Sequence, residues 1–141
     1  MKTTRFPALL SVTLAVTFAA APLSASERHR AGQWEITTTR PNAPSTTVKR
    51  CVDAEEAAGV NGDEKAFRAY LEKHSGGHDC KITDSSLNGP STSYGVTCGG
   101  MTMRTVTIYQ GDTFEGDRIV KDGAGPERTS HYKARRLGPC P

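Results

Sequence analysis

Four cysteines, at positions 51, 80, 98 and 140, place the strongest constraint on how this chain can fold. They are widely spaced, so the close cysteine pairs typical of zinc sites are missing. An even number of cysteines in a small chain with an export signal is typical of a disulfide framework. We therefore expect two disulfides, which four cysteines can form in three ways.

The N-terminal residues have the layout of a secretory signal peptide. Lys2 and Arg5 precede an apolar run over residues 6–21, and small residues follow it. A membrane anchor is the alternative, but the run is shorter than the ~20 residues that span a bilayer. We expect residues 1–26 to be removed, leaving residues 27–141 as one exported domain with no membrane span, in the periplasm or secreted.

The charge of the expected mature domain is nearly balanced. Without Lys2 and Arg5, 16 basic residues face 15 acidic ones, which gives no general argument for a nucleic-acid partner. The chain has one tryptophan and few large aliphatic residues. A small secreted domain with a thin core depends on its disulfides for stability.

The segment between residues 80 and 98 predicts a β-hairpin, because Asn88-Gly89 lies near its middle. If Cys80 lies opposite Cys98, then Ile82 faces Val96 and Asp84 faces Tyr94, and the apolar side chains share one face. A tight two-residue Asn-Gly turn would instead send the two cysteines to opposite faces. We therefore favour a longer loop through Asn88, Gly89 and Pro90, and a Cys80–Cys98 disulfide.

By elimination, Cys51 pairs with Cys140, which would join the last strand of the chain to an early one. Alternation predicts a strand over residues 33–39, a proline-containing loop over 41–47 and a second strand over 46–52. Asp53 can cap a short helical turn that Gly59 stops, and Asp63 can cap the one convincing helix. That helix carries an apolar stripe formed by Ala66, Phe67, Tyr70 and Leu71.

Further strand patterns follow the helix, which brings the total to about seven strands. They cover the hairpin and residues 105–109, 113–120 and 129–137. No βαβ pattern is present. We predict an α+β fold, mainly antiparallel β: a strongly curled meander sheet or partial barrel with one packed helix and two disulfides.

Several short motifs occur in a recognisable order: "GQWEITTT", "CVDAEEAA", "HDCKITD", "GVTC", "VTIYQGDTFEG" and "RRLGPCP". Together they resemble domain of unknown function 3617, a family of small exported bacterial proteins. The resemblance covers nearly the whole expected mature chain. It implies an exported protein with a cysteine-stapled fold and favours the periplasm, and it implies no activity.

Two weak patterns could bind metal. Met101 and Met103 flank Thr102 on an expected strand, so both side chains point to one face, and His131 could join them if the last strand is adjacent. Thioethers suit Cu(I), but methionines more often fill gaps in a core. His74 and His78 stand four apart, but Gly76-Gly77 interrupt the helix between them, so we expect no metal site and no cofactor.

Basic residues gather near the C-terminus, in the set Arg128, Lys133, Arg135 and Arg136. On one side of a strand they could bind a carboxylate or a phosphate. We favour the alternative that they protect a charged edge strand from aggregation.

No catalytic motif is present, and the cysteines are expected to be oxidised, so we expect no enzyme. The leading hypothesis is a binding protein for a small apolar ligand on the inner face of the curled sheet. That candidate face comprises Trp34, Ile36, Tyr94 and Val96. The alternatives are a protein–protein module, such as an inhibitor or accessory protein of the envelope, and a copper- or zinc-binding protein.

Overall fold

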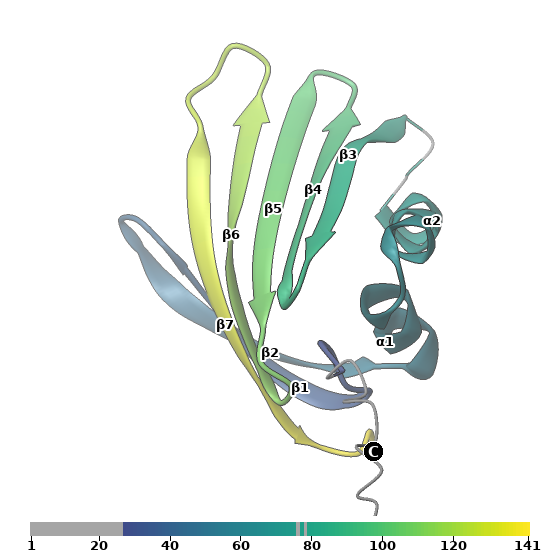
Figure 1. Ribbon diagram of the computed structural model, residues 1–141. Helices are drawn as coiled ribbons and strands as arrows, with labels where there is room; N and C mark the ends of the chain where they lie inside the picture. Colours follow the sequence, from purple (N-terminus) through teal and green to yellow (C-terminus); the bar gives the residue numbers. More distant parts are fainter. Residues whose placement is uncertain (1–26, 76, 78) are drawn as a thin grey trace, which may run out of the picture.

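The computed structural model describes residues 27–75, 77 and 79–141, so the expected signal peptide and His78 lie outside the described residues. Seven strands and two helices make up this part of the chain (Figure 1). In chain order they are β1 (Gly32–Arg40), β2 (Ala43–Val52), α1 (Ala54–Asn61), α2 (Glu64–Ser75), β3 (Cys80–Asn88), β4 (Ser91–Cys98), β5 (Met101–Tyr109), β6 (Thr113–Asp122) and β7 (Arg128–Gly138).

All seven strands belong to one antiparallel sheet with the order β2-β1-β7-β6-β5-β4-β3. The predicted antiparallel meander is therefore confirmed, with the β1–β2 hairpin added beside β7. The sheet is neither closed nor strongly curled, so the prediction of a strongly curled sheet or partial barrel was wrong. The physical reason is that β2 and β3 end the sheet on opposite sides and do not pair with each other.

Only one face of the sheet is covered by helices, and the core lies there (Figure 1). One apolar cluster joins β1, β2, α1 and β7, and it consists of Trp34, Val52, Ala57 and Ala134. A second cluster joins both helices to β3 and β4, and it consists of Val60, Phe67, Leu71, Ile82 and Val96. We call this covered side the inner face and the opposite side, which carries mostly polar residues, the outer face.

The structure has two helices where the sequence predicted one helix and a short turn. Asp53 caps α1 as predicted, since its Oδ1 accepts a hydrogen bond from the backbone of Glu56 at 2.8 Å. Gly59 does not end α1, which continues to Asn61. A Cβ at Gly59 would lie 2.5 Å from the ring of Tyr70, so this glycine allows α1 and α2 to pack closely.

The β3–β4 hairpin has the predicted pairing only at its open end. Cys80 pairs with Cys98 and Ile82 with Val96, but Asp84 pairs with Gly95 and not with Tyr94. A β-bulge between Ile82 and Asp84 shifts the register by one residue. The turn itself is a two-residue Gly89-Pro90 turn, with Gly89 at a φ of +56°. The turn is shorter than the predicted loop, which by itself would shift the pairing by one residue. The bulge reverses this shift, so both cysteines still lie on one face.

The expected loop over residues 41–47 is mostly strand. Only Pro41 and Asn42 form the turn, with Asn42 at a φ of +59°, and β2 begins at Ala43. Pro44 is tolerated inside β2 because β2 is an edge strand, where one side of the backbone needs no hydrogen-bond donor.

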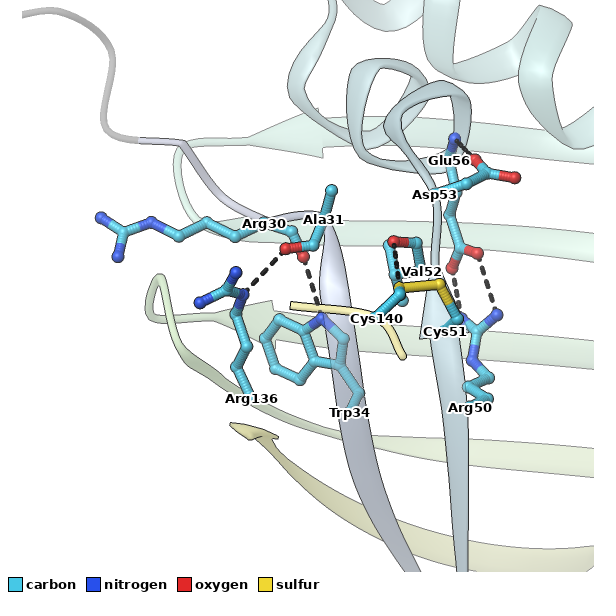
Figure 2. The surroundings of a disulfide bond; sticks show 10 residues. All are labelled: Arg30, Ala31, Trp34, Arg50, Cys51, Val52, Asp53, Glu56, Arg136 and Cys140. Carbon is cyan, nitrogen blue, oxygen red and sulfur yellow. Dashed lines mark hydrogen bonds and ion pairs between the residues drawn. A yellow bond between two sulfur atoms is a disulfide. The ribbon is translucent and has the colours of Figure 1, made fainter. Parts of the chain in front are cut away.

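Both disulfides have the predicted pairing, Cys51–Cys140 and Cys80–Cys98. The first joins β2 to the residues after β7, across a sequence separation of 89 residues. Around it, Trp34 Nε1 donates to the carbonyl of Arg30 at 2.8 Å, and Arg136 Nε donates to the carbonyl of Ala31 at 2.8 Å (Figure 2). The disulfide and these two bonds hold the segment before β1 and the end of β7 beside the first core cluster.

Candidate functional site

An open cavity of about 800 Å³ lies between the inner face of the sheet and the helices. Its volume falls in the range of small-molecule binding sites. The helices contribute the apolar residues Val60, Phe67 and Leu71 to the lining, together with Glu56, Tyr70 and Ser75. The sheet side is rich in hydroxyl groups and includes Thr92, Thr105, Thr107, Tyr94, Tyr109 and Tyr132.

Tyr132 crosses the sheet to build part of the cavity floor. Its hydroxyl lies 2.6 Å from Thr107 Oγ1 and donates to the carbonyl of Val106 at 3.0 Å, although β6 lies between β7 and β5. Gly116 makes this possible, because a Cβ there would lie 2.5 Å from the Tyr132 hydroxyl. The phenol and the glycine together fix one wall of the cavity.

Three phenols of the cavity, those of Tyr70, Tyr109 and Tyr132, have raised pKa values and are protonated at neutral pH. Burial raises the pKa of Tyr109 and the pKa of Tyr132 above the ordinary value of a tyrosine. Burial and the nearby Glu56 carboxylate raise the pKa of Tyr70 to about 12. Each phenol therefore keeps its one hydrogen-bond donor, which Tyr132 already uses on the carbonyl of Val106.

His29 is the least expected residue of the cavity lining. It is 2% exposed and stacks against Trp34, Tyr109 and Phe114, with ring centroids 4.8–5.4 Å apart. Its backbone is fixed by Asn61, whose side chain accepts from the His29 N–H at 2.9 Å and donates to its carbonyl at 2.7 Å. Within the described part of the chain, His29 Nδ1 and Thr105 Oγ1 are buried without a hydrogen-bond partner.

Glu56 is the only carboxylate among the residues that line the cavity. Arg50 binds it with both ends of its guanidinium, including an Nη1–Oε2 contact of 2.9 Å (Figure 2), and His29 Nε2 lies 3.8 Å from Oε1. Burial alone would raise the pKa of Glu56, but His29 and Arg50 outweigh it and hold this pKa below its usual range.

The lowered pKa predicts an acid-sensitive part of the stability. Glu56 is ionised more readily in the folded than in the unfolded state, so it stabilises the fold above its unfolded pKa. That contribution is lost as the pH falls through the lower, folded pKa. We expect Glu56→Gln to lower the free energy of unfolding at pH 7, with the difference from wild type shrinking towards pH 3. Urea unfolding across this pH range measures the difference, and a constant difference would contradict the assignment.

Of the four residues predicted to form the ligand-binding face, two line the cavity. Ile36 and Tyr94 line it. Trp34 and Val96 lie on the same inner face but are 0% and 3% exposed and belong to the two core clusters. Alternation along the strands placed these four residues on one side of the sheet, but it could not separate residues packed in the core clusters from residues that line the cavity.

The weak metal candidates are not brought together. Met101 and Met103 do share a face of β5, and Met103 lines the cavity, but His131 lies on the outer face and contacts Asp117 at 2.9 Å. The strand β6 also separates β5 from β7. His74 contacts Glu55 Oε1 at 3.3 Å. Among the described residues no group of three or more His, Cys, Asp or Glu side chains is placed to hold a metal.

The C-terminal basic residues do not form one patch, and β7 is not an edge strand. Because β1 pairs with one side of β7 and β6 with the other, the predicted edge role was wrong. Lys133 contacts Glu115 at 3.5 Å and Arg135 contacts Glu35 at 2.8 Å, both on the outer face. Arg136 binds the carbonyl of Ala31, whereas Arg128 lines the cavity.

Sequence reasoning missed His29, Arg40, Arg50 and Arg118 as lining residues. For Arg118 a signal was present: it alternates with Phe114, Gly116 and Val120, the inward positions of β6. For His29 there was none, because it lies before the first strand and reaches the cavity only through tertiary contacts.

A family model described as a protein of unknown function, DUF3617, matches residues 29–140. No curated protein and no solved structure matches the chain. The matched region contains both disulfides, both helices and all seven strands. The candidate cavity therefore lies wholly within it. Among the described residues, no helix is both long and apolar enough to span a membrane.

Proposed function

The chain belongs to the DUF3617 family, which has no assigned function, and from the cavity we propose a non-enzymatic protein that binds a small ligand. The observation that carries this proposal is the cavity of about 800 Å³ between the inner face and the helices. The two disulfides support a location in an oxidising compartment outside the cytoplasm, for which we propose the periplasm.

The lining of the cavity supports a binding role over a packing defect. Empty cavities in a core are apolar, whereas this one places hydroxyl groups and arginines beside apolar side chains. Two of its lining residues, His29 and Thr105, carry buried polar atoms without partners. A buried unpaired polar atom costs about 1–3 kcal/mol, and a bound ligand could offset part of that cost.

Thr38 offers a way to block the cavity without touching the core clusters. It is half-buried on β1 and lines the cavity, while its neighbour Thr37 points to the outer face and bonds Thr47. We expect Thr38→Phe to weaken binding of the neutral dye N-phenyl-1-naphthylamine at least about tenfold. Fluorescence titration measures the dissociation constant, with Thr37→Phe as the matched control on the same strand.

Two results would contradict the proposal. Wild-type protein that does not enhance dye fluorescence would show that no accessible apolar site exists. Equal weakening by the two phenylalanine variants would place the dye elsewhere. Native mass spectrometry of protein purified from the periplasm complements the titration. A discrete extra mass identifies a bound ligand. A protein partner of defined stoichiometry would favour the alternative role in protein–protein interaction.

A further inference from the structure

Three arginines line the cavity on the side away from α2, on β1, β6 and β7. Arg118 on β6 lies directly opposite Ser130 on β7, and Arg128 lies two residues from Ser130 on the same face. Diagonal neighbours of this kind have Cα atoms roughly 7–8 Å apart. Arg40 is next to Thr39 on β1. Thr39 pairs with His131 on β7, and His131 is next to Ser130. The three side chains therefore surround one position on the inner face, and we call them the arginine triad.

The arginine triad differs in its pairing from the outward-facing lysine and arginine of β7. On the outer face, Lys133, Arg135 and His131 each contact a carboxylate across the sheet. On the inner face, within the described residues, no carboxylate forms an ion pair with any of the three arginines. Lys133 and Arg135 on the outer face of β7 are thus paired with carboxylates, whereas the arginine triad on the inner face is available to a ligand.

Other groups in the cavity do not compensate the arginine triad. Glu56 is held by Arg50 and His29, so its charge is already matched. Arg118 lies over an aromatic ring, with its Cζ 6.0 Å from the centroid of Tyr132. This places the guanidinium against the phenol that forms the floor, in an orientation that suits cation–π contact. Three like charges on one face repel each other, so an anion bound among them would relieve that repulsion.

The opposite side of the cavity carries a group of apolar side chains. Val60, Phe67 and Leu71 from the helices and Met103 from β5 line it, and they belong to or pack against the second core cluster. Figure 1 shows α2 beside β3, with β6 and β7 on the far side of β5. A ligand that spans the cavity would therefore meet apolar side chains at one end and guanidinium groups at the other.

We propose that the ligand is an amphiphile with one anionic headgroup, a carboxylate or a phosphate, held by Arg40, Arg118 and Arg128, with its apolar body against the helices. This inference rests on the proposed ligand-binding function and adds the chemical class of the ligand. Arginine suits both headgroups because its planar guanidinium can donate two parallel hydrogen bonds to two oxygens. Ser130, at the centre of the triad, donates its hydroxyl proton to the carbonyl of Arg118 at 3.4 Å and so links β6 and β7 at this position.

Displacement of N-phenyl-1-naphthylamine by ligands with the same twelve-carbon chain tests this inference. We expect dodecanoate or dodecyl phosphate to displace the dye at concentrations about tenfold lower than 1-dodecanol. The better of the two anions identifies the headgroup. If the dye binds but both anions and the alcohol displace it equally, the arginine triad does not select an anion, while the proposed binding function stands. If the dye does not bind at all, the proposed function itself fails.

Two double variants test whether a preference for anions comes from the arginine triad or from the overall charge of the protein. Arg118→Gln with Arg128→Gln removes two positive charges from the inner face of β6 and β7, and Lys133→Gln with Arg135→Gln removes two from the outer face of β7. We expect the first pair to abolish the preference for anions over 1-dodecanol and the second pair to preserve it, with the affinity of each competitor calculated from the dye affinity measured for the same variant. If both double variants lose the preference for anions equally, the proposed anion site is wrong, because the preference would then depend only on long-range charge.

Discussion

Replacing both Cys51 and Cys140 with serine is expected to lower the free energy of unfolding by about 4 kcal/mol. This disulfide closes a loop of 89 residues, and in the chain-entropy model a long loop restricts the unfolded chain most. It also joins edge strand β2 to the end of β7, next to the first core cluster. Domains of this size unfold with about 5–15 kcal/mol, so the loss would remove a large part of the stability.

Urea unfolding without reductant, followed by the fluorescence of Trp34, measures this effect. The matched comparison is Cys80→Ser with Cys98→Ser, which opens a loop with a separation of only 18 residues. The same model gives about 3 kcal/mol for that loop, so the order of the two variants is itself a test. A smaller loss from the longer loop would show that native contacts around the disulfides outweigh the entropy of the unfolded chain.

Trp34→Ala is expected to destabilise the fold by about 4 kcal/mol, within the usual range for a buried large aromatic residue. Trp34 is 0% exposed and packs against His29 and Phe114, with ring centroids 4.8 and 5.1 Å away. Its Nε1 donates to the carbonyl of Arg30 at 2.8 Å. The substitution therefore leaves a cavity in the first core cluster and an acceptor without its donor.

Trp34→Phe is the control, because it restores most of the apolar volume but not the N–H donor. We expect it to cost only about 1–3 kcal/mol. Circular dichroism during urea unfolding suits both variants, since they remove the only tryptophan. Equal destabilisation by alanine and phenylalanine would assign the effect to the hydrogen bond with Arg30, and a negligible effect of alanine would contradict the core role of Trp34.

Local patterns predicted most of the secondary structure, and they failed where two local features acted together. The hairpin shows this: the two-residue Gly89-Pro90 turn and the bulge after Ile82 each shift the register, and their shifts cancel at Cys80 and Cys98. The pairing of the cysteines was therefore predicted correctly from a register that holds for only part of the hairpin. The prediction that Gly59 ends the first helical turn failed for another reason. The sequence cannot show that the ring of Tyr70 occupies the space beside this glycine.

The candidate site was less predictable than the fold. Alternation along a strand indicates which residues share a face, and it placed Ile36 and Tyr94 together on the inner side. It cannot indicate how much of that face the helices cover, which separated these two residues from Trp34 and Val96. The prediction that β7 is an edge strand failed for a related reason, since strand order depends on which distant strands pair.

The sequence by itself determined the antiparallel strands and the inward and outward positions along them, and through the hairpin it favoured the observed pairing of the cysteines. These features follow from short-range geometry: the two-residue period of a strand, the backbone needs of turns and the spacing of cysteines. Only the tertiary structure decided that the sheet stays open, that His29 enters the core and that Arg40, Arg118 and Arg128 gather around Ser130. Each of these depends on contacts between residues far apart in the chain, which no local pattern encodes.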